Sequence, residues 1–158
     1  MYDKLVKYDS QSGKFYSLTS NSNVKVGEEP KGSVDSKGYV RIGVCGKLYR
    51  AHRLAFLCMG VELPVQVDHK DMDKTNNSWD NLRPSTNQTN QWNTKKRVTN
   101  TSGHKNVFWR PERNHWQVRI ATKDNPRKYI GSYKDFEEAV KAATAARIEH
   151  QQEFSNHV

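Results

Sequence analysis

The segment 65–93, VQVDHKDMDKTNNSWDNLRPSTNQTNQWN, constrains the fold of this chain more than any other. Its start, Val65–His69, has the alternation and the β-branched residues of a short strand. A polar loop follows, and Asn81–Arg83 is expected to form a second short strand that a proline ends. Ser85 is suited to cap a helix that we predict to run to about Lys96. The segment therefore predicts a small unit of strand, loop, strand and helix.

Two groups of polar residues in this unit are candidates for chemistry. Asp68 and His69 stand together at the end of the first strand. Neighbouring side chains in a strand point to opposite faces, so both serve one site only if the strand ends there. On the helix, Asn90 and Asn93 are three residues apart and share one face. An acid followed by a histidine is a weak signal alone. The evidence for a catalytic site is the combination of this pair with the other polar residues at their spacing.

That joint pattern resembles the HNH endonuclease family, which has the ββα-metal fold, and within it the phage-type homing endonucleases. The residues that carry the likeness are Asp68-His69, Asn76-Asn77, Asp80-Asn81-Leu82 and the helical Asn90. The hairpin and His52-Arg53-Leu54 that precede them are also similar to this subgroup. The resemblance covers about residues 36–95.

The resemblance implies a role for each of four residues. Asp68 and Asn90 would be the oxygen ligands of one divalent ion, for which Mg²⁺ is the first expectation and Mn²⁺ a substitute. His69 would take a proton from the attacking water, and Asn81 would brace the loop that orients His69. Cleavage would leave a 5′-phosphate and a 3′-hydroxyl. Many members have histidine where this chain offers Asn90 or Asn93, and spacing favours Asn90.

Residues 1–60 predict β-hairpins followed by a helix. Residues 14–18 alternate as a strand, and strands at 38–44 and 47–50 flank the turn pair Cys45-Gly46. Residues 51–59 have apolar side chains at helical spacing. Within this helix, His52 is interpreted first as a structural histidine, and Arg53 is a candidate phosphate contact.

Residues 102–158 form a second pattern. They predict strands at 105–110, 115–121 and 127–133, then a helix capped by Asp135 that runs to about Gln152. Alternation on the second strand directs Trp116, Val118 and Ile120 toward the helix and the intervening residues outward. The pattern resembles the plant ethylene-response-factor DNA-binding domain, which implies strands that enter the major groove.

The charge distribution agrees with a nucleic-acid contact on this sheet. Residues 99–133 carry seven bases and two acids, whereas residues 134–158 carry three bases and five acids. Arginines of the sheet can read guanine edges or phosphates, and Gln117 can read adenine. The candidate DNA contacts of this region and the linker before it are Lys95, Lys96, Arg97, Arg110, Arg113, Gln117, Arg119, Arg127 and Tyr129.

Composition limits the class of protein. The formal charge of +9 indicates an anionic partner. Cys45 and Cys58 are too isolated for a zinc cluster built on paired thiolates and are expected to be reduced core residues. The first residues contain no apolar run, so we expect a cytoplasmic protein that is neither secreted nor bound to a membrane.

Together these patterns predict an α+β protein with a nuclease module and a DNA-reading module. The first, residues 1–94, combines amino-terminal β-hairpins with the HNH unit; a basic linker spans 95–101. The second, residues 102–158, is a three-stranded antiparallel sheet packed on one helix. The expected function is metal-dependent cleavage of double-stranded DNA, by a monomer or a homodimer without a small-molecule cofactor. The alternative is a non-catalytic, sequence-specific DNA-binding regulator with the same fold.

Overall fold

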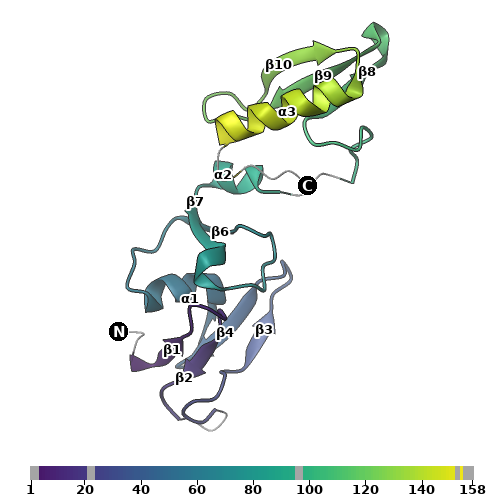
Figure 1. Ribbon diagram of the computed structural model, residues 1–158. Helices are drawn as coiled ribbons and strands as arrows, with labels where there is room; N and C mark the ends of the chain where they lie inside the picture. Colours follow the sequence, from purple (N-terminus) through teal and green to yellow (C-terminus); the bar gives the residue numbers. More distant parts are fainter. Residues whose placement is uncertain (1–3, 21–23, 95–97, 152–153, 155–158) are drawn as a thin grey trace. The chain divides into compact units, whose positions relative to one another are not determined.

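The computed structural model describes residues 4–20, 24–94, 98–151 and 154, which divide into two compact units, Met1–Thr86 and Asn87–Val158. Each unit is described by itself (Figure 1). The candidate phosphate contacts Lys95, Lys96 and Arg97 lie outside the described residues. The domain boundaries expected from the sequence, at 94 and 102, stay a prediction. Among the described residues, no helix is both long enough and apolar enough to span a membrane.

The first unit is built from short antiparallel ladders and one longer helix. Strands β1 and β2 pair with each other, β3, β4 and β5 form a three-stranded sheet, and β6 pairs with β7. The elements are β1 (Val6–Tyr8), β2 (Phe15–Ser17), β3 (Gly32–Val34), β4 (Val40–Val44), β5 (Lys47–Arg50), α1 (Ala51–Cys58), β6 (Gln66–His69), the 3₁₀ turn η2 (Trp79–Asn81) and β7 (Leu82–Ser85).

The predicted hairpin at Cys45-Gly46 is confirmed. Val44 pairs with Lys47 across the turn, and the two turn residues have φ angles of +48° and +75°, as a type I′ turn requires. Cys45 is exposed at this turn, so the expectation that it is a core residue was wrong. A two-residue hairpin loop extends past the sheet into solvent, and burial of its side chain would need a covering element.

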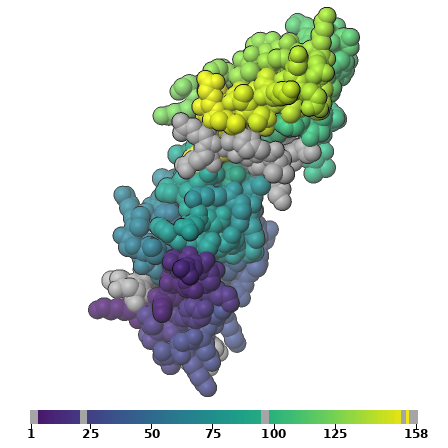
Figure 2. Space-filling model, viewed as in Figure 1, coloured from purple at the N-terminus to yellow at the C-terminus, as the bar shows by residue number. Residues whose placement is uncertain are grey.

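The core of this unit lies between α1 and the surrounding strands. Leu54 and Ala55 are fully buried on α1, and Phe15 and Val67 approach them from β2 and β6. In the space-filling view the amino-terminal residues (dark purple) lie at the surface of the unit beside teal residues of the segment 65–93 (Figure 2). One small core thus ties the amino-terminal hairpin to the segment that carries Asp68 and His69.

The structure corrects two expectations after the second strand of the segment 65–93. Strand β7 continues through Pro84 to Ser85, which pairs with Gln66, so Ser85 does not cap a helix. A two-stranded ladder has only edge strands, and an edge strand tolerates a proline. The helix that follows, α2, spans Asn87–Trp92 and does not reach Lys96. Its short length reflects polar, weakly helix-forming residues such as asparagine and threonine.

The second unit contains the predicted three strands and helix, preceded by α2. The strands β8 (Val107–Arg110), β9 (His115–Ile120) and β10 (Lys128–Tyr133) form a sheet in the order β10-β9-β8, and α3 spans Phe136–Gln151. Val107 and Val118 pack on Ala139 and Ala143 of α3. The small alanine side chains let α3 lie close to the sheet. Antiparallel sheets and helices in both units confirm the mixed α+β class predicted from the sequence.

Candidate active site

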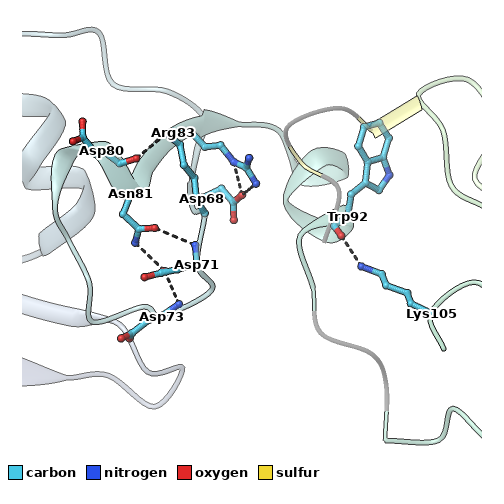
Figure 3. A network of polar contacts seen from close by, with 9 residues as sticks. Asp68, Asp71, Asp73, Asp80, Asn81, Arg83, Trp92 and Lys105 are labelled. Carbon is cyan, nitrogen blue, oxygen red and sulfur yellow. Dashed lines mark hydrogen bonds and ion pairs between the residues drawn. The ribbon is translucent and has the colours of Figure 1, made fainter. Parts of the chain in front are cut away.

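Asp68 and Arg83 form a buried ion pair across the β6–β7 ladder. They are direct register partners, and both side chains are almost completely buried. Arg83 donates to the Asp68 Oδ2 atom from Nε at 2.9 Å and from a terminal nitrogen at 2.6 Å (Figure 3). A buried carboxylate needs such a partner, because its desolvation would otherwise cost several kcal/mol. The carboxylate expected to hold a cation thus already faces a positive charge.

His69 lies at the last position of β6 and is 4% exposed. Its Nε2 lies 3.3 Å from the Asn77 Oδ1 atom. Burial lowers the pKa of His69 below its ordinary value, against the opposing effects of Asn77 and of the Asp71, Asp68 and Asp73 carboxylates. The lowered pKa keeps the ring neutral near pH 7, as a general base must be before it accepts a proton.

Two other rings pack against His69. The His52 ring meets it edge to face at a centroid distance of 5.2 Å, and Tyr39 lies 6.1 Å from it and 5.0 Å from His52. Arg50 and Lys74 stack on Tyr39. Burial, followed by the charges of His69 and nearby arginines, lowers the pKa of His52 to about 3. His52 is therefore a neutral core histidine, and its ring is also part of the wall around His69.

Asn81 braces the loop that follows His69. Its Oδ1 accepts from the Asp71 backbone N–H at 3.0 Å, and its Nδ2 donates to Asp71 Oδ1 at 2.9 Å (Figure 3). The same Nδ2 also donates to the Asn76 carbonyl at 2.8 Å. The Asp71 carboxylate also accepts from the Asp73 N–H and from the Asn76 amide. The expected loop brace is present, but the side chain in contact with His69 is Asn77.

The second candidate ligand lies on α2, in the other unit. Asn90 is half-buried there, and Asn93, just past the helix, is buried. Among the described residues, no three side chains of the His, Cys, Asp or Glu types are grouped to hold a metal ion. One carboxylate and one amide oxygen fit a hard cation that retains water and phosphate ligands. These oxygen donor types suit a divalent ion, but Arg83 already donates twice to the Asp68 Oδ2 atom, and its positive charge opposes a cation at that atom.

The second unit presents a mixed basic and aromatic surface on the sheet face opposite α3. Phe108 and Tyr129 are exposed there, and Tyr129 pairs with Arg119 across the ladder. Arg110 and Arg119 both line two hollows of about 350 and 390 Å³. The Arg119 Nε atom is buried and has no hydrogen-bond partner in the described part of the chain. The outward direction predicted for these side chains agrees with the register of the strands.

Some candidate DNA contacts are already occupied. Gln117 is only 9% exposed, and its Oε1 accepts from the Arg110 Nε at 3.0 Å. Adenine recognition uses both atoms of a glutamine amide, so Gln117 would have to leave Arg110 first. Arg53 donates to the carbonyls of Pro64 and Val65 at 3.3 and 3.4 Å. Arg113 is exposed at the end of the 3₁₀ turn Pro111–Arg113, and Arg127 is exposed in the turn before β10.

The close-up also shows how the end of α2 is held within the second unit (Figure 3). The Lys105 ammonium donates to the carbonyls of Trp92 at 2.7 Å and Thr94 at 2.8 Å (Figure 3). Arg147, which is fully buried on α3, donates to the Lys105 carbonyl at 2.8 Å. These bonds join the end of α2 to the sheet and helix of the same unit.

Sequence reasoning missed two residues of the site, Arg83 and Asn77. Arg83 faces Asp68 only because the loop from 70 to 81 sets the register of β6 on β7, and the sequence does not define that register. Asn77 reaches His69 because the same loop folds back. The pair Asn76-Asn77 was part of the resemblance, which was the one available signal.

Comparison with known proteins agrees with the family resemblance seen in the sequence. Residues 49–92 match the family model described as HNH endonuclease, and this range runs from β5 to the end of α2. Residues 49–92 are thus similar to the HNH endonuclease family and are called the HNH endonuclease domain below. The match includes Asp68, His69, Asn81 and Asn90, and it excludes the β1–β2 hairpin and the whole sheet of the second unit. The likeness of that sheet to the ethylene-response-factor domain stays a prediction.

Two curated phage proteins are similar to the chain around its HNH endonuclease domain. DNA endonuclease I-HmuI of Bacillus phage SP01 is 38% identical over 96 residues, which cover 57% of this chain and 52% of the relative. Protein 3.8 of Escherichia phage T7 is 39% identical over 54 residues, 34% of this chain and 45% of the relative. The chain thus spans about half the length of the curated relatives it matches.

A solved structure that describes DNA binding and cleavage by the HNH homing endonuclease I-HmuI is also similar. The likeness has a TM-score of 0.46 and 26% identity, and it covers 87% of this chain and 76% of that one.

Proposed function

We propose that this protein is a metal-dependent DNA endonuclease of the homing type. The observation that carries the proposal is His69, a buried, neutral imidazole next to Asp68 at the end of β6 within the HNH endonuclease domain. The name of the relative I-HmuI, a DNA endonuclease, supports the same substrate. A phage origin of both curated relatives supports action in the cytoplasm of a bacterial host.

The reaction is hydrolysis of a phosphodiester bond. His69 takes one proton from the attacking water while the water oxygen bonds to phosphorus, and the bond from phosphorus to the 3′-oxygen breaks. The 3′-oxygen then takes up a proton, which leaves a 3′-hydroxyl and a 5′-phosphate. Asp68 and Asn90 would hold a divalent ion, which when bound neutralises charge on the phosphate and the leaving oxygen. Asn81 keeps the loop beside His69 in place.

The sheet of the second unit is the proposed DNA-binding surface. Phe108, Arg119 and Tyr129 lie on its outer face, and an arginine there can donate to a phosphate or a base edge. Residues 99–133 carry a net charge of +5, which attracts a phosphate backbone. In this proposal the second unit selects the site that the HNH endonuclease domain cuts.

Cleavage of supercoiled plasmid with Mg²⁺ or Mn²⁺ tests the activity. Wild type should produce nicked or linear DNA, and His69→Ala should be at least about 100-fold slower with unchanged DNA affinity, because the general base is gone. Chelation with EDTA should stop the reaction. A wild-type protein that binds DNA but does not cut it, whichever divalent ion is added, would instead support the non-catalytic regulator.

A further inference from the structure

We propose that the β1–β2 hairpin is a positioning element for His69 and that it acts through Asn77. The proposal rests on the proposed function of His69 as the general base. The hairpin lies outside residues 49–92, the range that matches the HNH endonuclease family. Three of its contacts nevertheless fall on three consecutive residues, 77–79, of the segment that follows His69.

The first contact is a hydrogen bond from Tyr8. The Tyr8 hydroxyl donates to the Asn77 carbonyl oxygen at 2.7 Å, between residues 69 positions apart in the chain. The Tyr8 ring packs on the buried Phe15 ring at a centroid distance of 4.8 Å, and this packing holds the ring that carries the hydroxyl in place. Burial raises the pKa of the Tyr8 phenol, and the group therefore keeps the hydrogen that it donates.

The second and third contacts are made by the hairpin turn. Gly13 has a φ of +72°, and a Cβ there would lie 2.4 Å from both the Asn77 carbonyl carbon and the Ser78 nitrogen. Only glycine permits this approach, because any side chain would overlap the backbone. The Ser10 carbonyl accepts from the Trp79 N–H at 2.8 Å. The turn therefore fixes the backbone on both sides of Ser78.

Asn77 passes this restraint on to His69. Its Nδ2 donates to the Thr75 carbonyl at 2.9 Å, which directs Oδ1 toward the His69 Nε2 at 3.3 Å. An amide oxygen only accepts, so the contact requires a hydrogen on Nε2 and places the lone pair of the neutral ring on Nδ1. The contacts from Tyr8 to Asn77 and from Asn77 to His69 thus set both the position of the His69 ring and its tautomer.

A wrong tautomer or a displaced base slows the chemical step without weakening substrate binding. Tyr8→Phe removes one hydroxyl and should lower kcat by about 3- to 10-fold, the worth of one hydrogen bond. Asn77→Ala removes the acceptor and should lower kcat by about 10- to 100-fold. In both variants KM and the affinity for DNA should stay unchanged. The matched control is Tyr16→Phe, a tyrosine of the same hairpin on the neighbouring strand β2.

A measurement that does not depend on cleavage uses ¹⁵N NMR of the histidine rings in the metal-free, full-length protein. We expect His69 in the Nε2–H form in wild type and Tyr16→Phe, and a mixture of tautomers in Asn77→Ala. Gly13→Ala should shift the His69 signals in the same direction as Tyr8→Phe. If wild type fails to cut DNA, the proposed function is lost, but these spectra still test the positioning.

The opposite result is equally clear. If Tyr8→Phe has the kcat and the His69 spectrum of Tyr16→Phe, the hairpin does not position the base. A drop in thermal stability without either change would make the hairpin a purely structural element and overturn the proposal.

Discussion

At the residue scale, Arg83 offsets the energetic cost of burying the Asp68 carboxylate in the candidate site. Its guanidinium neutralises a carboxylate buried at 5% exposure. Arg83→Met would keep most of the volume and leave the Asp68 charge buried without that partner. We expect the free energy of unfolding of the first unit to fall by about 3 kcal/mol, at the low end for breaking a buried ion pair. Urea denaturation followed by the NMR signals of Leu54 and Ala55 measures the loss.

Arg53→Met is the control for that experiment. Arg53 belongs to the same unit, and its guanidinium makes two longer hydrogen bonds to backbone carbonyls. This substitution should cost no more than about 1 kcal/mol. Equal losses in the two variants would mean that the buried pair has no special energetic role.

His52 gives the first unit a pH dependence. Its pKa is about 3 in the folded chain, against the ordinary value of 6.5 that holds once the chain unfolds, so below pH 6.5 the unfolded chain binds a proton that the folded chain does not. Stability is therefore complete above pH 6.5 and falls as the pH drops toward 3, by at most about 1.4 kcal/mol per pH unit from this group. His52→Asn should flatten the curve between pH 6.5 and about 4.

The same NMR-detected urea titration, repeated at several pH values, gives the slope of the free energy of unfolding against pH for each variant. His115→Asn, in the second unit, is the control for a general effect of losing a histidine. A His52→Asn slope equal to that of wild type would show that His52 takes up its proton equally in both states.

Residue types revealed the candidate site only in part. Asp68, His69, Asn81 and Asn90 could be selected because their chemistry and spacing agree with a known family. Asn77 and Arg83 could not, because their roles depend on the register and the fold of a loop. Long-range contacts of this kind are set by tertiary packing, to which local sequence patterns respond weakly.

At the scale of elements, the second unit was predictable because its signals are local. Strands β8 to β10 alternate, and Asp135 caps α3 by accepting from the Glu138 N–H at 2.9 Å. The errors occurred where local signals conflict: Ser85 and Pro84 suggested a helix start, but pairing with β6 extended β7. Cross-strand hydrogen bonds outweighed the preference of serine for a cap.

The cap of α3 can be tested directly. Asp135→Ala removes the side-chain oxygen that satisfies the first turn of the helix and should lower the stability of the second unit by about 1 kcal/mol. Thermal denaturation followed by far-ultraviolet circular dichroism measures it, with Asp124→Ala, an exposed loop acid, as the control. A loss in Asp124→Ala as large as in Asp135→Ala would indicate a charge effect in place of a capping effect.

At the scale of the whole molecule, charge is unevenly divided along the chain. Residues 61–98 carry six bases and five acids, whereas residues 1–60 carry ten and five, and residues 99–133 seven and two. A segment with a net charge of +1 attracts a polyanion weakly, so most of the affinity for DNA should come from the flanking regions. Binding and cleavage are then separable by mutation.

Arg119→Ala tests that separation. If the outer face of the sheet holds DNA, loss of this guanidinium should weaken binding by about 1 to 3 kcal/mol, or 5- to 150-fold, and raise KM accordingly. Metal affinity and kcat at saturating DNA should stay unchanged, because the proposed chemistry belongs to the HNH endonuclease domain. Lys141→Ala, which removes one positive charge from an exposed position of α3, should change binding far less. Fluorescence anisotropy at several salt concentrations, combined with metal titration calorimetry, separates the two effects. Loss of metal affinity in Arg119→Ala would refute this division of labour, and equal weakening by Lys141→Ala would place the DNA elsewhere than on the sheet.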